Sequence, residues 1–332
     1  MKYGLLSYGN RHTGRFNIGD HIQSLAARQY LPQVDQYIER DKLNSESISS
    51  ELAVIMNGWF THNPENWPPN PNINPFFISF HLNSHHAKAL LSNHKNVDYL
   101  KQYEPIGCRD ENTVNWLTKY GIKAYYSSCL TTTLDIDYKT DNKTDDIIIV
   151  DLLYKNDYKQ IYKDTPWRII PHLLKGKYFE RNKRENIINE LIPKDILEKA
   201  KYETHSYYTK DFNEEERFVL ADSLLKKYAS AKLVITSRIH CALPCLAIGT
   251  PVVFIAGGDL FNEHEMSRLR GTIEHLNIVS AEEVKFDSNL TETIKIHDKN
   301  SFDWNNVQNN NKFNYYASKL KEQCYDFIST FK

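Results

Sequence analysis

The N-terminal part of the chain alternates short, continuous apolar runs with segments that have helical spacing. The runs at 3–8, 52–56 and 76–80 have the length of strands and are apolar on both faces, which is typical of parallel sheets covered by helices. Apolar residues recur at helical spacing in 17–30 and 110–120. This alternation predicts an α/β unit with a parallel sheet.

A second α/β series follows a polar stretch. Residues 135–146 are charge-rich and show no periodicity, so we interpret them as an inter-domain linker. Beyond them, strands and helices are expected in the order 147–150, 181–200, 214–229, 233–236, 238–249 and 252–255. The last segment, 311–332, has apolar residues at three-to-four spacing and predicts a helix that packs on the body.

Together these patterns predict an α/β fold with two Rossmann-like parallel-sheet domains that face each other across a cleft. We place an N-terminal domain at 1–140, a C-terminal domain at 146–300 and the returning helix at 311–332. In open parallel sheets, ligands bind outside the carboxyl ends of the strands. Polar residues that directly follow an apolar run are therefore the candidates for a functional site.

The composition limits the classes of protein that fit. The chain has 332 residues, enough for two domains, and a net charge of −1. A bulk nucleic-acid binder would need a basic surface, so nucleic acid is not an expected partner. No apolar stretch reaches the roughly 18 residues of a membrane-spanning helix, and the N-terminus does not look like a secretory signal. The five cysteines include no CxxC pair, so we expect free thiols and a cytoplasmic location.

The most informative polar run is 236–240, which directly follows the apolar residues 233–235. It places Ser237, Arg238 and His240 at the carboxyl edge of a strand and at the start of a helix, where backbone N–H groups favour anions. A guanidinium can hold a carboxylate or phosphate with two hydrogen bonds, and an imidazole can donate a proton near neutral pH. An ion pair of Arg238 with a nearby carboxylate and a capping role for His240 would explain the same residues without a function.

Four further residues lie at comparable positions. His81 follows a strand directly, and Arg109 lies between a strand and a helix, where it could hold an anion or pair with the acidic residues after it. Asp20 lies in a Gly-Asp turn at a helix start, which a helix N-cap would explain equally well. His205 follows a short predicted strand and is either a second acid or base or a histidine on the surface.

Aromatic and basic residues beside these positions extend the candidate site. Asn57 and Trp59 follow the run 52–56; the Trp59 ring could stack on a sugar, whereas a hairpin turn would explain the Asn-Gly pair equally well. Arg270 could complete an anion pocket or belong to a solvated face. The histidines between 85 and 94 lack carboxylate or cysteine neighbours at ligand spacing, so we expect no metal site.

Three blocks of the chain carry motifs that recur together in one family. Residues 17–28 open with Asn-Ile-Gly-Asp, Gly107-Cys108-Arg109-Asp110 precedes a helix, and 227–255 contain Ser-Arg-Ile-His and Gly-Thr-Pro-Val-Val. In this order the blocks resemble the polysaccharide pyruvyltransferase family. The resemblance implies a two-domain fold like that of the GT-B glycosyltransferases, with the acceptor on the N-terminal side and phosphoenolpyruvate, as the donor, on the C-terminal side.

The resemblance also implies roles for the candidate residues. The residues expected to take part in catalysis are His240, Arg238, Asp20 and His205. Those expected to bind the donor are Arg238, Arg109, His81, Ser237 and Arg270. Those expected to bind the acceptor are Asn17, Gly19, Asn57 and Trp59.

The implied activity is transfer of pyruvate from phosphoenolpyruvate to a sugar, such as galactose as a cyclic 4,6-ketal, during capsular or exopolysaccharide biosynthesis in bacteria. His240 would protonate the donor's methylene carbon, while Arg238 and Arg109 would neutralise its anionic groups. Phosphoenolpyruvate would be a co-substrate, and no cofactor is expected. A lipid-linked oligosaccharide is one form of acceptor, and it would bring a cytoplasmic enzyme to the inner membrane face. Two alternatives stay open: a GT-B glycosyltransferase that uses a nucleotide sugar, and a non-catalytic carbohydrate-binding component.

Overall fold

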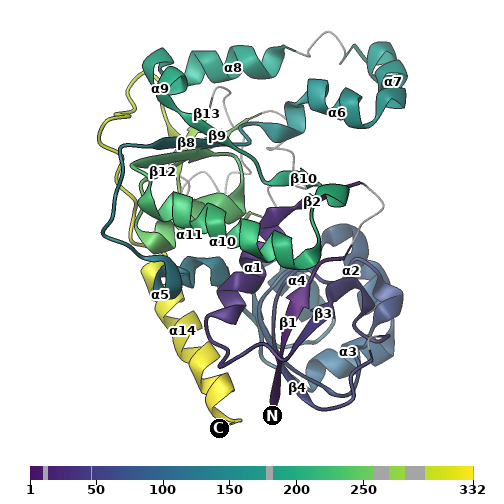
Figure 1. Ribbon diagram of the computed structural model, residues 1–332. Helices are drawn as coiled ribbons and strands as arrows, with labels where there is room; N and C mark the ends of the chain where they lie inside the picture. The colour runs from purple at the N-terminus through teal and green to yellow at the C-terminus, as the bar shows by residue number, and fades with distance from the viewer. Residues whose placement is uncertain (10–13, 46, 177–181, 258–268, 281–295, 332) are drawn as a thin grey trace.

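The fold is built on two parallel sheets, one above the other in Figure 1. The computed structural model describes residues 1–9, 14–45, 47–176, 182–257, 269–280 and 296–331. The six strands of the N-terminal sheet are, in spatial order, β3 (Gln36–Glu39), β1 (Lys2–Ser7), β4 (Leu52–Gly58), β5 (Ile73–Phe80), β6 (Ile106–Cys108) and β7 (Ala124–Tyr126). The six strands of the C-terminal sheet are β14 (Ile296–His297), β13 (Asn277–Ser280), β12 (Val252–Ala256), β11 (Leu233–Thr236), β8 (Ile147–Val150) and β9 (Lys201–Glu203). All strand pairs in both sheets are parallel, which confirms the predicted fold class.

Helices connect the parallel strands, as such sheets require. The N-terminal half contains α1 (Ile18–Arg28), α2 (Ser84–Leu91), α3 (His94–Lys101) and α4 (Glu111–Lys119). The C-terminal half contains α6 (Tyr158–Asp164), α7 (Ile169–Leu174), α8 (Lys183–Leu191), α9 (Lys194–Lys199), α10 (Glu214–Ser230) and α11 (Ile239–Ile248). The helical pattern predicted over 181–200 forms two helices: Pro193 separates α8 from α9, because proline cannot donate the hydrogen bond that would continue the first helix.

The Asn-Gly pair after the first apolar run is not a hairpin turn. Strand β4 continues through Gly58 and pairs in parallel with β1 and β5. Gly58 has a positive φ of 88°, and a Cβ there would lie 2.7 Å from Oε1 of Gln23. Glycine is therefore needed for the backbone conformation and for the close approach of α1, not for chain reversal.

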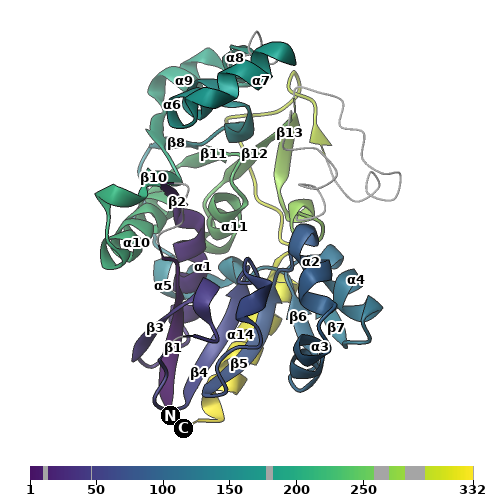
Figure 2. The same cartoon turned by 90° about the vertical axis from the view of Figure 1, so that its right-hand side faces the viewer.

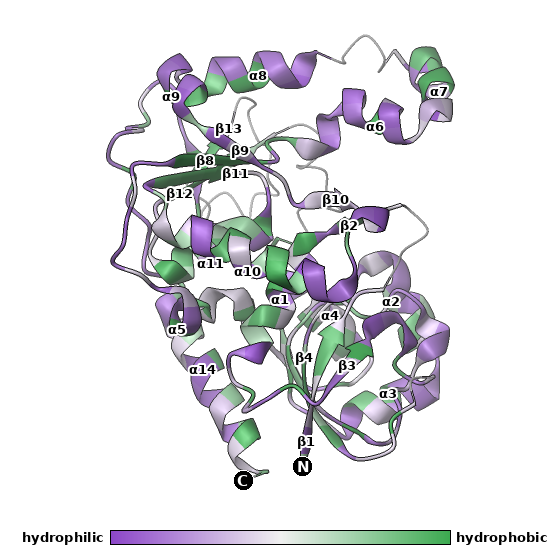
Figure 3. Cartoon of the chain, in the orientation of Figure 1, coloured by the Kyte–Doolittle hydropathy of each residue, from purple (hydrophilic) through white to green (hydrophobic). Residues whose placement is uncertain are grey.

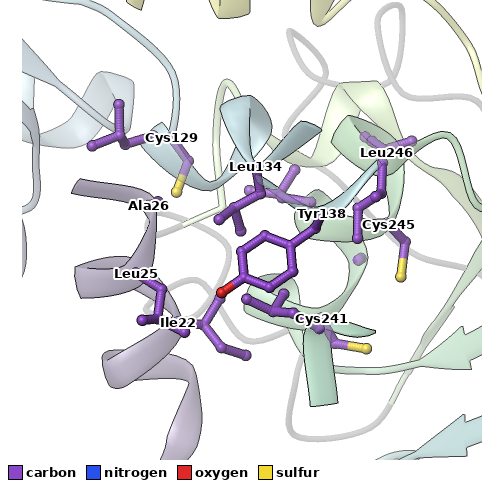
Figure 4. Packing of buried hydrophobic residues seen from close by; sticks show 14 of the residues in the cluster. Ile22, Leu25, Ala26, Cys129, Leu134, Tyr138, Cys241, Cys245 and Leu246 are labelled. Atoms are coloured by element: carbon purple, nitrogen blue, oxygen red, sulfur yellow. The ribbon is translucent and has the colours of Figure 1, made fainter. Parts of the chain in front are cut away.

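The two halves share one hydrophobic core. Figure 4 shows Ile22 and Leu25 of α1 facing Tyr138 and, on α11, Cys241 and Leu246. These residues come from both halves of the chain and belong to one continuous cluster of buried side chains. In this core, α1 of the N-terminal half packs against α10 and α11 of the C-terminal half, so close packing holds the two halves together.

A small antiparallel ribbon adds a second link between the halves. Strand β2 (Arg15–Asn17) pairs with β10 (Ser206–Tyr208), and the rings of Phe16 and Tyr207 stack with their centroids 5.8 Å apart. The ribbon leads directly into α1, whose first backbone N–H, at Ile18, donates to the His205 carbonyl.

The C-terminal helix α14 (Asn314–Ser329) returns to the N-terminal half. Its Phe327 ring stacks on Phe76 at 5.0 Å, and the two chain ends lie at the same end of the molecule in Figures 1 and 2. The segment predicted as a linker begins with a short helix, α5 (Asp135–Tyr138), and the proposed domain boundaries stay a prediction. None of the described helices is long and apolar enough to cross a membrane.

Candidate functional site

A polar cavity lies where loops from the two sheets meet. Strand ends of the N-terminal sheet contribute three side chains to its lining: Trp59 follows β4, His81 follows β5 and Arg109 follows β6. The complete lining consists of Asn17, Asp20, Gln23, Trp59, His81, Arg109, Tyr154, His205, Ser237, Arg238, Ile239, His240, Phe254, Leu269 and Thr272. The structure thus brings together nine of the twelve residues singled out from the sequence.

Inside the cavity, a polar contact between the two halves joins Arg109 to His240. Nη1 of Arg109 lies 3.3 Å from Nε2 of His240 and 3.3 Å from Oε1 of Gln23. Both Arg109 and His240 are buried. Gly19 backs the imidazole so closely that a Cβ there would lie 3.1 Å from Cβ of His240.

This contact defines the protonation of the imidazole in the structure. Arginine is always protonated and only donates, so Nε2 of His240 accepts and carries no proton while the contact lasts.

Arg238 forms the ion pair with a nearby carboxylate that the sequence left open. Its Nε donates to Oδ2 of Asp151 at 2.8 Å, and the cation that reaches the His240 imidazole is Arg109. The guanidinium also stacks on the Tyr154 ring at 3.5 Å. Among the described residues nothing accepts a hydrogen bond from its two Nη atoms, which are the pair that can hold a carboxylate or phosphate.

Asp151 is the residue that organises this side of the cavity, and the sequence reasoning missed it. It directly follows β8, so the same strand-end rule would have found it. Its Oδ2 accepts from Arg238 and from the His205 backbone N–H, at 2.9 Å. Burial alone would raise the pKa of Asp151, but Arg238 and the hydrogen bond from His205 outweigh it and hold the pKa below its usual value. Asp151 is therefore ionised at neutral pH and fixes Arg238 in place.

His81 and Asp110 form a buried pair on the opposite side. Nδ1 of His81 lies 2.6 Å from Oδ2 of Asp110, and both side chains are completely buried. Asp110 caps α4, with Oδ1 accepting from the backbone N–H and the hydroxyl of Thr113. Because the carboxylate accepts from Nδ1, it fixes the tautomer and orientation of the imidazole.

Asp20 is held by an arginine that the sequence reasoning also missed. Nη2 of Arg40, a residue 2% exposed, lies 3.2 Å from Oδ2 of Asp20, and its Nη1 donates to the Trp59 carbonyl at 2.9 Å. Arg40 also lies over the Tyr8 ring at 4.5 Å. The N-cap of α1 is Asn17, not Asp20, so the capping explanation of Asp20 is wrong.

His205 is buried at 1% exposure, which overturns its reading as a surface histidine; Nε2 lies 2.9 Å from the Tyr228 hydroxyl. Ser237 lines the cavity, but its hydroxyl donates to the Ile255 carbonyl at 2.6 Å.

The remaining three candidates do not line the cavity. Gly19 supports His240 from behind, and Asn57 is buried with Nδ2 donating to the Gln23 carbonyl at 2.9 Å. Arg270 is half-buried and absent from the lining, although its neighbours Leu269 and Thr272 belong to it. Within the described residues, no three His, Cys, Asp or Glu side chains gather as metal ligands would.

A second cavity shares part of its lining with the first. Its lining consists of Tyr8, Gly9, Arg15, Phe16, Asn17, Asp20, His21, Ser206 and Arg238. Asn17, Asp20 and Arg238 line both cavities. The Asp20 carboxylate therefore belongs to both cavities. The first also presents Arg109, and the second presents Arg15 beside aromatic side chains.

Comparisons with known proteins give one family. The model of a family described as polysaccharide pyruvyl transferase matches residues 17–259, more than half of the chain. No curated protein matches the chain. Among solved structures, a functionally uncharacterized protein from Klebsiella pneumoniae subsp. pneumoniae NTUH-K2044 is 14% identical, covers 80% of this chain and 86% of its own, and has a TM-score of 0.43.

Proposed function

The chain belongs to the polysaccharide pyruvyl transferase family, and from this membership we propose that it transfers the pyruvyl group of phosphoenolpyruvate to two hydroxyls of one sugar. The observation that supports the donor is the pair of guanidinium groups, Arg109 and Arg238, which reach one cavity from different sheets. Phosphoenolpyruvate carries a phosphate and a carboxylate, so it offers one anion to each arginine.

The proposed reaction begins with proton transfer. Once the donor's anions lie beside Arg109, His240 takes up a proton and delivers it to the methylene carbon, which becomes a methyl group. The carbon that bears the phosphate becomes an oxocarbenium-like centre. One sugar hydroxyl adds to that centre and loses its proton to Asp20, which Arg40 holds at 3.2 Å.

Loss of phosphate completes the exchange. The C–O bond to phosphate breaks, Arg238 and Arg109 stabilise the departing anion, and phosphate carries away one proton. The second hydroxyl then adds to the same carbon and loses its proton, which closes the cyclic ketal. One donor and one sugar with two free hydroxyls give one ketal and one inorganic phosphate, with no cofactor and no change of oxidation state.

The acceptor part of the proposal uses the second cavity. The sugar would enter beside Asp20, which lines both cavities, and would extend toward the first cavity, where the Trp59 ring could contact its apolar face. We propose a hexose such as galactose, ketalised at its 4- and 6-hydroxyls, in the assembly of a capsular or extracellular polysaccharide.

Phosphate release from phosphoenolpyruvate tests the proposal. The protein would be incubated with the donor and a panel of galactose, glucose and mannosamine derivatives, and phosphate and ketal would be measured together. We expect equal amounts of both with at least one acceptor, and thermal stabilisation by phosphoenolpyruvate rather than by nucleotide sugars. Stabilisation by a nucleotide sugar alone, with no phosphate released from phosphoenolpyruvate, would reject the proposal in favour of glycosyl transfer.

A further inference from the structure

Exposed apolar side chains gather on one peripheral segment, residues 158–175, which comprises α6, a short 3-10 turn and α7. In the described part of the chain, four of the eleven exposed large hydrophobic residues lie within eight positions of this segment. Their exposed fractions are 65% for Trp167, 67% for Ile170, 42% for Leu173 and 85% for Leu174. Single exposed apolar residues are normal, whereas a contiguous cluster marks an interaction site.

The segment lies away from the hydrophobic core. In Figures 1 and 2, α6 and α7 lie on the outer side of the C-terminal sheet, and α7 is at the edge of the molecule. Figure 3 shows hydrophobic positions on α7 next to the hydrophilic surface of α6. The exposed apolar side chains of this segment belong to none of the buried clusters formed by the described residues.

The charge around this cluster is basic. Residues 155–175 contain five Lys and Arg side chains and two Asp side chains in a chain whose net charge is −1. Asp164 is paired with Arg15, at 3.4 Å. Lys163, Arg168 and Lys175 are exposed, and no described carboxylate lies within ion-pair distance of them. The positive charge that surrounds the apolar cluster is thus available to an anionic partner.

We propose that the segment 158–175 docks onto the surface of a membrane that contains anionic lipids. Tryptophan with aliphatic neighbours inserts at the level of the lipid headgroups, while lysine and arginine bind the anionic headgroups beside it. The Arg168 guanidinium lies 5.6 Å from the Trp167 ring, so the basic and the apolar elements are adjacent. Exposed apolar residues alone, or basic residues alone, would not point to a bilayer as the partner. Their combination on a peripheral segment does.

Contacts at the end of α6 tie this segment to the second cavity. Asp164 accepts from the Tyr208 hydroxyl at 3.0 Å and pairs with Arg15, and Arg15 lines the second cavity together with Asp20. Docking would bring that cavity close to the bilayer, where a lipid-linked sugar is presented. This last consequence rests on the proposed function, whereas membrane docking itself does not.

Binding to vesicles tests the proposal without any turnover. Vesicles of phosphatidylcholine alone would be compared with vesicles that also contain phosphatidylglycerol, by co-sedimentation at low and high salt. We expect at least about tenfold stronger partitioning to the anionic vesicles, weakened by salt. Trp167 is the one exposed tryptophan of the five, so its emission should shift to shorter wavelength on binding, and Trp167→Phe should remove that shift.

Paired variants locate the docking surface. Ile170→Ser with Leu174→Ser should lower partitioning by about tenfold or more, since both apolar anchors are lost. The matched control is Val219→Ser on α10, where the side chain is 64% exposed outside the segment, and it should bind like the wild type.

A second pair of variants tests the basic residues. Lys163→Gln with Arg168→Gln should lower binding to anionic vesicles but not to neutral ones. The control Lys226→Gln, on α10 with a side chain 70% exposed, should leave binding to both kinds of vesicle unchanged. Phosphate release with a soluble acceptor should be unchanged in all of these variants, so loss of docking and loss of catalysis are separable. Absence of wild-type binding to anionic vesicles would overturn the proposal. Binding insensitive to the segment variants would overturn it too, as would self-association in solution that Ile170→Ser with Leu174→Ser abolishes.

Discussion

The two walls of the cavity hold their charged groups in opposite ways. The N-terminal wall includes Asp20, Trp59, His81 and Arg109, and the C-terminal wall includes Tyr154, His205, Arg238 and His240. On the N-terminal wall, His81 and Asp20 each have a buried ionisable partner: Asp110 lies against His81, and Arg40 lies against Asp20. On the C-terminal wall Arg238 uses only Nε for Asp151 and stacks on an aromatic ring.

This difference indicates which side chains orient the acceptor and which bind the donor. Groups whose hydrogen bonds are fixed by buried partners hold their geometry before any ligand arrives, which is what a base and a positioning arginine need. An arginine with two nitrogens directed away from its carboxylate partner can take an anion without losing its anchor. We therefore propose that Asp20 and its partner Arg40 orient the sugar, and that Arg238 captures the donor together with Arg109, which reaches across the cavity to His240.

The largest effect is expected for His240→Ala. Turnover should fall by about a hundred- to ten-thousandfold, because a general acid contributes on this order, while the affinity for phosphoenolpyruvate stays close to that of the wild type. Initial rates of phosphate release would measure turnover, and calorimetric titration would measure the affinity for phosphoenolpyruvate. His94→Ala, an exposed histidine at the start of α3, is the control and should leave both values unchanged. Near-normal turnover in His240→Ala would assign the proton source elsewhere.

A smaller effect is expected for Arg40→Lys, which tests the N-terminal wall. Lysine keeps the charge but cannot contact both Asp20 and the Trp59 carbonyl, so Asp20 loses its fixed orientation. We expect kcat to fall by about ten- to a hundredfold and the KM for the acceptor to rise, with the affinity for phosphoenolpyruvate unchanged. If donor affinity fell and kcat did not, the division between the walls would be wrong.

The smallest effect is expected for Asp151→Asn, measured as the free energy of unfolding against pH. The pKa of Asp151 lies below its usual value in the folded chain, so its ionised form contributes stability above about pH 4, and this contribution is lost as the pH falls through the folded pKa. Urea unfolding should show the variant less stable by about 1–3 kcal/mol at pH 7, with the difference shrinking toward pH 3.

The exposed pair Lys194–Glu198 offers the matched control for that measurement. Glu198→Gln removes a surface charge with a partner 3.4 Å away, and solvent screens such pairs, so stability should hardly change. A difference for Asp151→Asn that stays constant from pH 7 to pH 3 would mean that its charge does not hold Arg238.

The sequence alone predicted the members of the cavity better than their contacts. His81, Arg109 and Arg238 were found because each follows an apolar run, and strand ends of a parallel sheet share one edge. Asp151 follows the run 147–150 and carried the same signal, so it was within reach of that reasoning.

Two features of the candidate site leave no recognisable local pattern in the sequence. Arg40 follows β3, which has only one buried residue in four, so no apolar run pointed to it. The contact between Arg109 and His240 joins residues 131 positions apart in the two halves, and the packing of the halves, including α1 against α10 and α11, brings them together. Patterns of single elements predict strand ends, whereas the pairing of side chains across the cavity depends on how the two halves pack.

Calorimetric binding of phosphoenolpyruvate to the wild type, Arg238→Lys and Arg109→Lys tests the central claim most directly, that one guanidinium from each sheet holds the donor. Each variant keeps its charge and loses the planar fork, so we predict donor affinity about tenfold weaker in each. Unchanged affinity for phosphoenolpyruvate in both variants would contradict the claim.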